Sequence, residues 1–102
     1  MNRGEVWWAE HPDAGRRPYL VLTRQGAITV LSRVLAVPAT RTVRGSPTEV
    51  QLDEDDGMRD HCALSFDNLV TMPKSLFTER ICRLGVDRLD QVCQALRAAS
   101  GC

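Results

Sequence analysis

Apolar residues occur along the chain in short runs, and Gly, Pro and charged residues separate each run from the next. Runs of this length that are rich in β-branched and aromatic side chains are typical of strands. PYLVLT is apolar up to its final threonine, as in a strand buried on both faces, whereas TEVQL alternates as a half-buried strand does. The pattern predicts strands over residues 5–10, 18–23, 28–37, 48–52 and 76–84, and one bent strand or two short ones over residues 62–72.

Proline and glycine indicate where these strands start and stop. Pro18 has no N–H, which is tolerated at the first residue of a strand, and it holds the preceding Arg17 in an extended conformation. Pro38 is expected to end the third strand, so that residues 39–47 form a loop. The segment DEDDG, residues 53–57, is expected to be a solvated acidic turn.

The pattern changes to a helical one near the C-terminus. Gly85 is an acceptable N-cap, and Asp87 places a carboxylate in the first turn, where it favours the helix dipole. Gly101 is expected to end the helix. The apolar positions at helical spacing are Leu89, Val92, Cys93 and Leu96.

Many short strands followed by one helix predict a mainly β fold with a C-terminal α-helix, built as a small barrel or a strongly coiled sheet. The 102 residues fit a single domain that spans residues 1–102. No apolar run approaches the roughly 20 residues that span a bilayer, and the N-terminus lacks the apolar segment of a signal peptide. We therefore expect a cytoplasmic protein without a membrane partner.

The cysteines and histidines do not form a metal-binding pattern. None of the four cysteines is paired as C-x-x-C, and only His11 and His61 are available to complete a site. We expect no metal and no other cofactor. Cys82 and Cys93 are expected in the core and Cys102 as a loose terminal thiol, while both histidines are expected at the surface.

The charges cancel over the whole chain but are unevenly distributed. Residues 1–44 carry seven Arg and three acids, whereas residues 49–67 carry one Arg and seven acids. Twelve of the thirteen cations are Arg, whose guanidinium donates two parallel hydrogen bonds to a phosphate. A GC-rich genome explains the same bias, so composition alone leaves the cause open.

Five segments, in order, resemble the MazF/PemK toxin family: RGEVWW, GRRPYLVL, VPATRTVRGSPTEVQL, DNLVTMPKS and the final GVDRLDQVCQALRAAS. The resemblance implies an SH3-like small barrel of the MazF/CcdB type, assembled as a homodimer. It also implies a sequence-selective, metal-independent endoribonuclease that cuts single-stranded RNA (messenger, transfer or ribosomal) and is inhibited by a cognate MazE-like antitoxin. Two departures are the short turn before Arg17, which in the family contributes to gripping RNA, and the acidic block 53–61.

The resemblance also implies the site residues. The catalytic Arg of the family directly precedes proline, which is Arg17 here, and its catalytic Thr closes the third strand, which is Thr40 here. Such a pair would stabilise the phosphate while the 2′-hydroxyl attacks it, leaving 2′,3′-cyclic phosphate and 5′-hydroxyl ends. The remaining candidates are Arg16, Arg41 and Arg44 for RNA phosphates, and Asp67 and Asn68 for base edges; each is otherwise a plain surface or turn residue.

Three further expectations depend on how the chain folds. The segments GRRP and ATRTVR are expected to bring Arg16, Arg17, Thr40, Arg41 and Arg44 to one face. Trp7 and Trp8 point to opposite faces of a strand, which places one of them in the core. The acidic loop 53–56 is either a solvated turn or a weak internal competitor for the arginines.

Two other functions are compatible with this kind of chain. One is a fold relative that poisons DNA gyrase without nuclease activity, as CcdB does. That subgroup depends on a C-terminal Trp-Gly-Ile, whereas this chain ends in AASGC. The other is an Arg-rich RNA-binding module that has lost activity.

Overall fold

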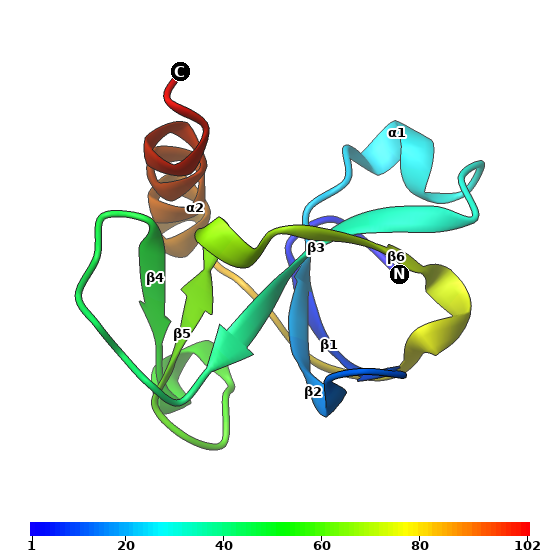
Figure 1. Ribbon diagram of the computed structural model, residues 1–102, viewed down its shortest axis with the longest axis horizontal. Helices are drawn as coiled ribbons and strands as arrows, with labels where there is room; N and C mark the ends of the chain where they lie inside the picture. Colours follow the sequence, from blue (N-terminus) through cyan, green and yellow to red (C-terminus); the bar gives the residue numbers. More distant parts are fainter.

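The computed structural model describes residues 1–102 and is built from seven strands, two α-helices and three 3-10 turns (Figure 1). In chain order they are β1 (Glu5–His11), β2 (Gly15–Val21), α1 (Gln25–Ile28), β3 (Arg33–Thr40), β4 (Glu49–Leu52), η1 (Glu54–Asp56), β5 (Cys62–Ser65), η2 (Phe66–Asn68), β6 (Val70–Pro73), η3 (Lys74–Leu76), β7 (Phe77–Arg83) and α2 (Val86–Ser100). No helix is long and apolar enough to cross a membrane.

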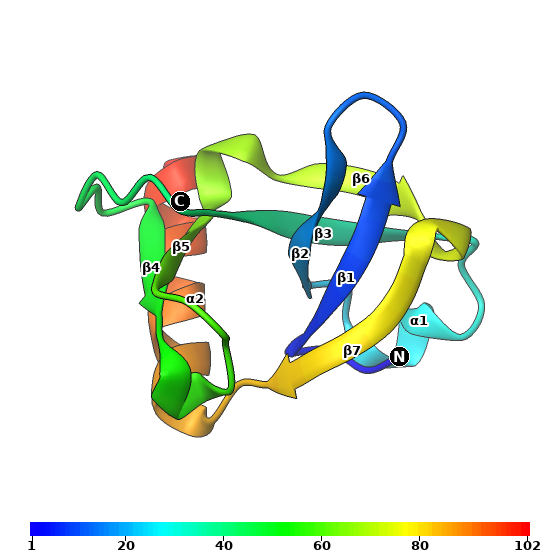
Figure 2. The same cartoon turned by 90° about the horizontal axis from the view of Figure 1, so that it is seen from below.

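The strands form one antiparallel sheet in the order β4-β5-β3-β2-β1-β7, and β6 pairs with the first half of β3. The two views show this sheet curling around its own axis, with α2 beside β4 and β5 (Figures 1 and 2). No ladder joins β7 to β4, so the barrel stays open. The predicted mainly β fold with a C-terminal helix is confirmed.

Strand β3 connects the two halves of the sheet. On one side it pairs with β2, from Tyr19 opposite Pro38 to Val21 opposite Ala36. On the other side it pairs first with β6 and then, at its last two residues, with β5. Strand β1 lies between β2 and β7, where Glu5 faces Arg83 near the other end of the chain.

Two apolar clusters lie on opposite sides of the curled sheet. The larger contains 14 buried residues, among them Leu20, Leu64 and Phe66, and Val92 of α2 packs into it. The smaller surrounds Tyr19 and contains four buried residues. Each fully buried Leu or Phe stabilises the fold by about 1.5–3 kcal/mol relative to an exposed one. These clusters hold the ends of β2 and β3 in fixed positions.

Two predicted strands have the wrong ends. Strand β2 begins at Gly15, so Pro18 lies inside it and not at its first residue, and the predicted strand over residues 28–37 is wrong at both ends. Residues 25–28 form the short helix α1, and β3 begins only at Arg33 and continues through Pro38 to Thr40. Pro38 is accepted within the strand because it lies between the residues that pair with β6 and those that pair with β5. The segment 62–72 forms two strands separated by η2, one of the two arrangements expected.

Helix α2 has the predicted ends, with Gly85 as N-cap and Gly101 as a left-handed C-cap. Cys93, however, is exposed, so its predicted place in the core is wrong. Val92 and Ala95 are the buried positions of α2, and the 3.6-residue repeat turns Cys93 away from the line they define. Cys102 is exposed as expected, and burial raises the pKa of the partly buried Cys82 to about 11.

Neither tryptophan is fully buried, so the expectation that one belongs to the core is also wrong. The Trp7 indole N–H donates to Oε1 of Glu5 at 3.1 Å. Burial alone would raise the pKa of Glu5, but hydrogen bonds from Trp7, Asn2 and Arg80 outweigh it and lower the pKa to about 2. These contacts connect the start of β1 to β7.

Candidate active site

Strands β2 and β3 bring Arg17 and Thr40 together. Tyr19 of β2 lies opposite Pro38 of β3, and moving two residues outward along each strand leads to Arg17 and Thr40. Positions two residues apart on a strand share a face of the sheet, so both side chains point to the side on which Tyr19 lies. The convergence expected from Pro18 and Pro38 is therefore present in the structure.

The two residues line one pocket of about 150 Å³. Strand β2 contributes Arg17, and strand β3 contributes Pro38 and Thr40. The other lining residues come from the loop 41–48, β4, β5 and η2. The lining residues are Arg17, Pro38, Thr40, Thr42, Arg44, Glu49, Ser65 and Asn68. The pocket thus combines two guanidinium groups, three hydroxyl groups, one amide and one carboxylate.

The two arginines of the pocket have no carboxylate partner. Arg17 is half-buried, Arg44 is exposed, and neither side chain forms an ion pair or a hydrogen bond. The positive charge of Arg17 reaches the neighbouring Tyr19, whose pKa is raised by burial and partly lowered again by this charge. Both guanidinium groups are therefore free to donate to an anion.

The loop 41–48 is held over the pocket by local hydrogen bonds. Oε1 of Glu49 accepts from the backbone N–H groups of Arg44, at 3.0 Å, and Gly45, at 2.9 Å. Gly45 adopts φ +72°, a conformation that other residues rarely take. The N–H of Thr42 donates to Oγ1 of Thr40 at 3.2 Å. That contact uses a lone pair of Thr40 and leaves its own hydroxyl hydrogen available to a ligand.

The opposite rim of the pocket belongs to β5 and η2. Nδ2 of Asn68 donates to Oγ of Ser65 at 2.8 Å, which fixes the amide beside the pocket. Asp67 does not line the pocket, and its Oδ2 accepts from the hydroxyl of Thr48 at 2.7 Å. Of the two residues predicted to contact bases, the structure places Asn68 in the pocket and Asp67 outside it.

Arg16 and Arg41 do not join the pocket, so the expectation that five donors share one face is wrong. Strand alternation sends Arg16 to the face opposite Arg17, where its guanidinium lies 4.3 Å from the centre of the Trp8 ring. Arg16 also pairs with Glu79 at 3.8 Å. Arg41 turns towards Asp60, at 3.6 Å.

Sequence reasoning missed three residues of the pocket: Thr42, Glu49 and Ser65. Glu49 falls in a segment whose alternation predicts only a half-buried strand, and nothing in the sequence distinguishes it from other strand carboxylates. Thr42 and Ser65 carry no local signal at all. All three owe their place to the loop 41–48 and to the pairing of Glu49 with Ser65 across β4 and β5.

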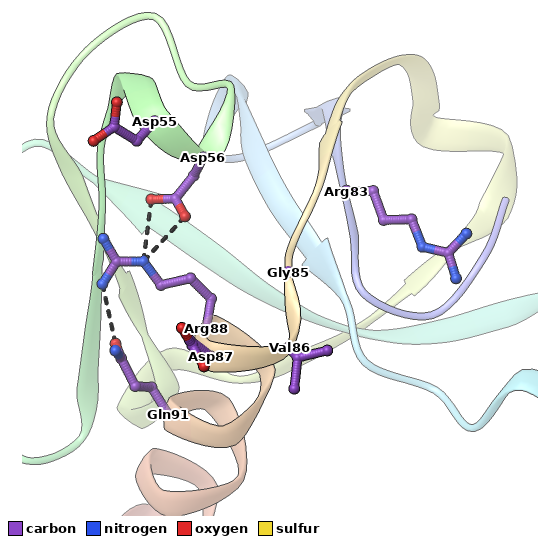
Figure 3. A pocket seen from close by; sticks show the side chains of 8 residues that line it. All are labelled: Asp55, Asp56, Arg83, Gly85, Val86, Asp87, Arg88 and Gln91. Carbon is purple, nitrogen blue, oxygen red and sulfur yellow. Dashed lines mark hydrogen bonds and ion pairs between the residues drawn. The ribbon is translucent and has the colours of Figure 1, made fainter.

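A larger hollow of about 530 Å³ lies at the start of α2 (Figure 3). Figure 3 shows Arg88 reaching across it to Asp56, with Nε at 3.0 and 3.2 Å from the two carboxylate oxygens. Asp53 lies 3.5 Å from the same guanidinium. Arg88 is neutralised by its own neighbours, whereas Arg83, Asp55 and Asp87 line the hollow without an ion pair. Within the acidic loop, Asp53 and Asp56 are paired with Arg88 and not with Arg17.

The two histidines lie outside both pockets. Nδ1 of His11 accepts from the N–H of Asp13 at 3.1 Å, and the ring of His61 contacts the side chain of Gln51 at 3.0 Å. His11 is the last residue of β1 and His61 precedes β5, and they do not form a pair that faces one site. His61 is exposed as expected, whereas His11 is half-buried.

Fold and pocket together define a small β-protein whose curled sheet offers two arginines and several hydroxyl groups to an anion. The sequence model of the PemK-like, MazF-like toxins of type II toxin–antitoxin systems matches residues 2–100, and the chain belongs to this family.

Individual relatives agree with this assignment. The chain is 43% identical over 103 residues to a probable endoribonuclease MazF2 of Mycobacterium tuberculosis, with all of both chains covered. Its structure is similar to that of the Mycobacterium tuberculosis toxin MazF-mt6, with a TM-score of 0.89 and 30% identity over 95% of this chain and 96% of that one. A MazE–MazF structure from Deinococcus radiodurans is similar at a TM-score of 0.83 and 28% identity, covering 99% and 96% of the two chains.

Proposed function

We propose that this chain is the endoribonuclease toxin of a type II toxin–antitoxin system and that Arg17 and Thr40 are its catalytic residues. The observation that carries the proposal is the pocket, in which two unpaired guanidinium groups and the free hydrogen of Thr40 face the same space. The 43% identity to a probable endoribonuclease over the whole chain supports the same activity. The chain acts in the cytoplasm, where its RNA substrate is made.

Each pocket residue then has a place in the chemistry. The 2′-hydroxyl of the substrate attacks the adjacent phosphorus, and negative charge gathers on the phosphate oxygens in the transition state. Arg17 donates two parallel hydrogen bonds to those oxygens, and Thr40 donates a third. Fixed donors of this kind are worth about 10²–10³ in rate each. With these donors the reaction needs no metal ion.

The rest of the pocket binds the strand on either side of the cut. Arg44 contacts a neighbouring phosphate, and Asn68 presents its amide to a base edge. Single-stranded RNA, whose bases are unstacked, can present both a phosphate and a base edge to these residues. Arg16 and Arg41, which point elsewhere, contribute at most to long-range attraction of the RNA.

The partner is a MazE-like antitoxin, because a MazE–MazF structure is similar to this chain over nearly its full length. An acidic antitoxin segment fits a pocket with two unpaired arginines for the same reason that a phosphate does. The homodimer implied by the family stays a prediction. The gyrase-poison alternative is not favoured, because the matching relatives are named endoribonucleases.

A cleavage assay on defined single-stranded RNA tests the proposal. Purified protein should cut the RNA in the presence of excess EDTA and leave 5′-hydroxyl and 2′,3′-cyclic phosphate ends. Replacing the 2′-hydroxyl by hydrogen at the cut position should abolish cleavage while the modified strand still binds. Cleavage of that modified strand would rule out attack by the 2′-hydroxyl.

A further inference from the structure

The proposed reaction requires a group that removes the proton from the attacking 2′-hydroxyl. Arginine stays protonated in proteins, and a threonine hydroxyl is a very weak base, so neither Arg17 nor Thr40 is suited to this step. The pocket contains one side chain of the right chemical kind, the carboxylate of Glu49. A positioned general base typically contributes about 10²–10⁴ in rate.

The contacts of Glu49 leave one carboxylate oxygen available. Glu49 is the first residue of β4 and pairs with Ser65 of β5, so its backbone is fixed by the sheet. Its Oε1 accepts from two consecutive N–H groups of the loop, at 3.0 and 2.9 Å. Oε2 has no hydrogen-bond partner within the protein, and the residue forms no ion pair. The two N–H groups thus orient the carboxylate without occupying its second oxygen.

Other carboxylates and imidazoles are less suited because each is engaged elsewhere. Asp67 is adjacent in space through Thr48, but its Oδ2 accepts a hydrogen bond at 2.7 Å and the residue does not line the pocket. His11 and His61 contact Asp13 and Gln51 outside it. The charged groups that share the pocket with Glu49 are Arg17 and Arg44, and neither can accept a proton.

We propose that Glu49 is the general base of this RNA cleavage, an inference that rests on the endoribonuclease function proposed above. Oε2 of Glu49 takes the proton of the 2′-hydroxyl while O2′ forms its bond to phosphorus. The bond between phosphorus and O5′ breaks, its electron pair stays on O5′, and O5′ takes a proton from water. Glu49 then returns its proton to the solvent, so one proton leaves O2′, one reaches O5′, and no water is consumed.

The variant Glu49→Gln separates a base from a residue that only holds the loop. Glutamine keeps a carbonyl oxygen that accepts from the N–H groups of Arg44 and Gly45, but it does not take up a proton. We expect kcat to fall about 10²-fold or more while the thermal midpoint and the affinity for a 2′-deoxy strand stay the same or rise. If Glu49→Gln cuts within a few-fold of the unaltered protein and only Glu49→Ala is impaired, Glu49 holds the loop and the inference is wrong.

The pH dependence gives a second readout that a structural role would not change. A base must be deprotonated to act, so kcat/KM of the unaltered protein should decrease in acid. Glu49→Gln should lack this acidic limb. An acidic limb that persists unchanged in the variant would assign it to another group and would overturn the inference.

A substrate with sulfur in place of the leaving O5′ identifies the proton transfer that is lost. Sulfur leaves without being protonated, so this substrate rescues variants that lack help to the leaving group, but not variants that lack the base. Glu49→Gln should therefore stay slow, and recovery to the rate of the unaltered protein would contradict a base. The matched control is Glu54→Gln, an exposed acid of η1 that should cut normally. If the unaltered protein itself cuts no RNA, the proposed function is wrong. That outcome is separate from the role of Glu49, because it does not depend on any variant.

Discussion

Arg88 and Arg17 line two different pockets of this molecule, and they differ in whether a carboxylate neutralises them. Arg88, at the start of α2, has its guanidinium bound to Asp56 at 3.0 Å and lies 3.5 Å from Asp53. Arg17, within β2, has no carboxylate partner, although it is half-buried beside Tyr19. The first arginine is already neutralised and joins η1 to α2, whereas the second keeps its charge for a ligand. The size of the hollow is therefore a poor guide to the site, since the larger one belongs to Arg88.

The largest effect is expected from Arg17→Ala. Removing one fixed donor to the transition state should lower cleavage about 10²–10³-fold. Because Arg17 makes no contact that stabilises the fold, circular dichroism and the thermal midpoint should stay as they are. Single-turnover cleavage of a defined RNA measures the effect. Cleavage near the original rate would show that Arg17 is not a catalytic residue.

Thr40→Val tests the hydroxyl that accompanies Arg17. Valine keeps the branched shape of threonine at the end of β3 but cannot donate a hydrogen bond. We expect a loss of about 10²-fold in the same assay, with a small change in stability because the N–H of Thr42 loses its acceptor. Thr71→Val, at an exposed position of β6, is the control and should cut normally.

Arg88→Ala should have the opposite profile from Arg17→Ala. It leaves the largely buried carboxylate of Asp56 without its partner, so the free energy of unfolding should fall by about 1–2 kcal/mol. The thermal midpoint should then drop by several degrees, while the remaining folded protein cuts RNA at its usual rate. Loss of cleavage at full stability would mean that this pocket also takes part in catalysis.

Glu5 is a second structural partner of arginine, and acid should reveal its contribution. Its pKa lies at about 2 in the folded protein, below the ordinary 4.5, so the stability it provides is complete above pH 4.5 and is lost as the pH falls towards 2. Thermal midpoints of the unaltered protein and of Glu5→Gln should therefore differ near neutral pH and converge in acid. A constant difference over this range would contradict the assignment.

The smallest effect is expected from Arg16→Ala, although Arg16 is adjacent to Arg17 in sequence. Its contacts with Trp8 and Glu79 are exposed, and each kind is worth at most about 1 kcal/mol. Cleavage should change less than threefold and the thermal midpoint by only a few degrees. A loss as large as that of Arg17→Ala would show that the two neighbouring arginines act together.

The features that could be predicted from the sequence are those that depend on interactions between residues close together in the chain. The family pattern marks both Arg17 and Thr40, whereas the strand ends expected at Pro18 and Pro38 are wrong because both prolines lie inside strands. The ends of α2 were predictable for local reasons, from Gly85 and Gly101. The fold class followed from the apolar pattern, which depends only on neighbouring residues.

The predictions are wrong where contacts between segments distant in the sequence determine the structure. The local pattern predicts that Pro38 stops a strand. In the structure it lies between the residues of β3 that pair with β6 and those that pair with β5, where no N–H is required on that side. Arg16 was grouped with Arg17 by sequence, whereas strand alternation places them on opposite faces. The sequence does not mark Glu49, because its place in the pocket depends on a loop that folds back onto it. Each error comes from a tertiary contact that the local pattern does not encode.

The position of β1 between β2 and the edge strand β7 has a consequence for the synthesis of the toxin. β1 pairs with β7, so residues near the beginning of the chain must wait for residues 77–83 before the sheet is complete. Contacts between such distant segments slow folding and delay it until most of the chain has left the ribosome. All residues of the Arg17 pocket precede β7, and the strands that carry them pair with one another, whereas β1 beside β2 keeps an unpaired edge until β7 is made. The sheet that holds the pocket is therefore complete only once residues 77–83 have been synthesised.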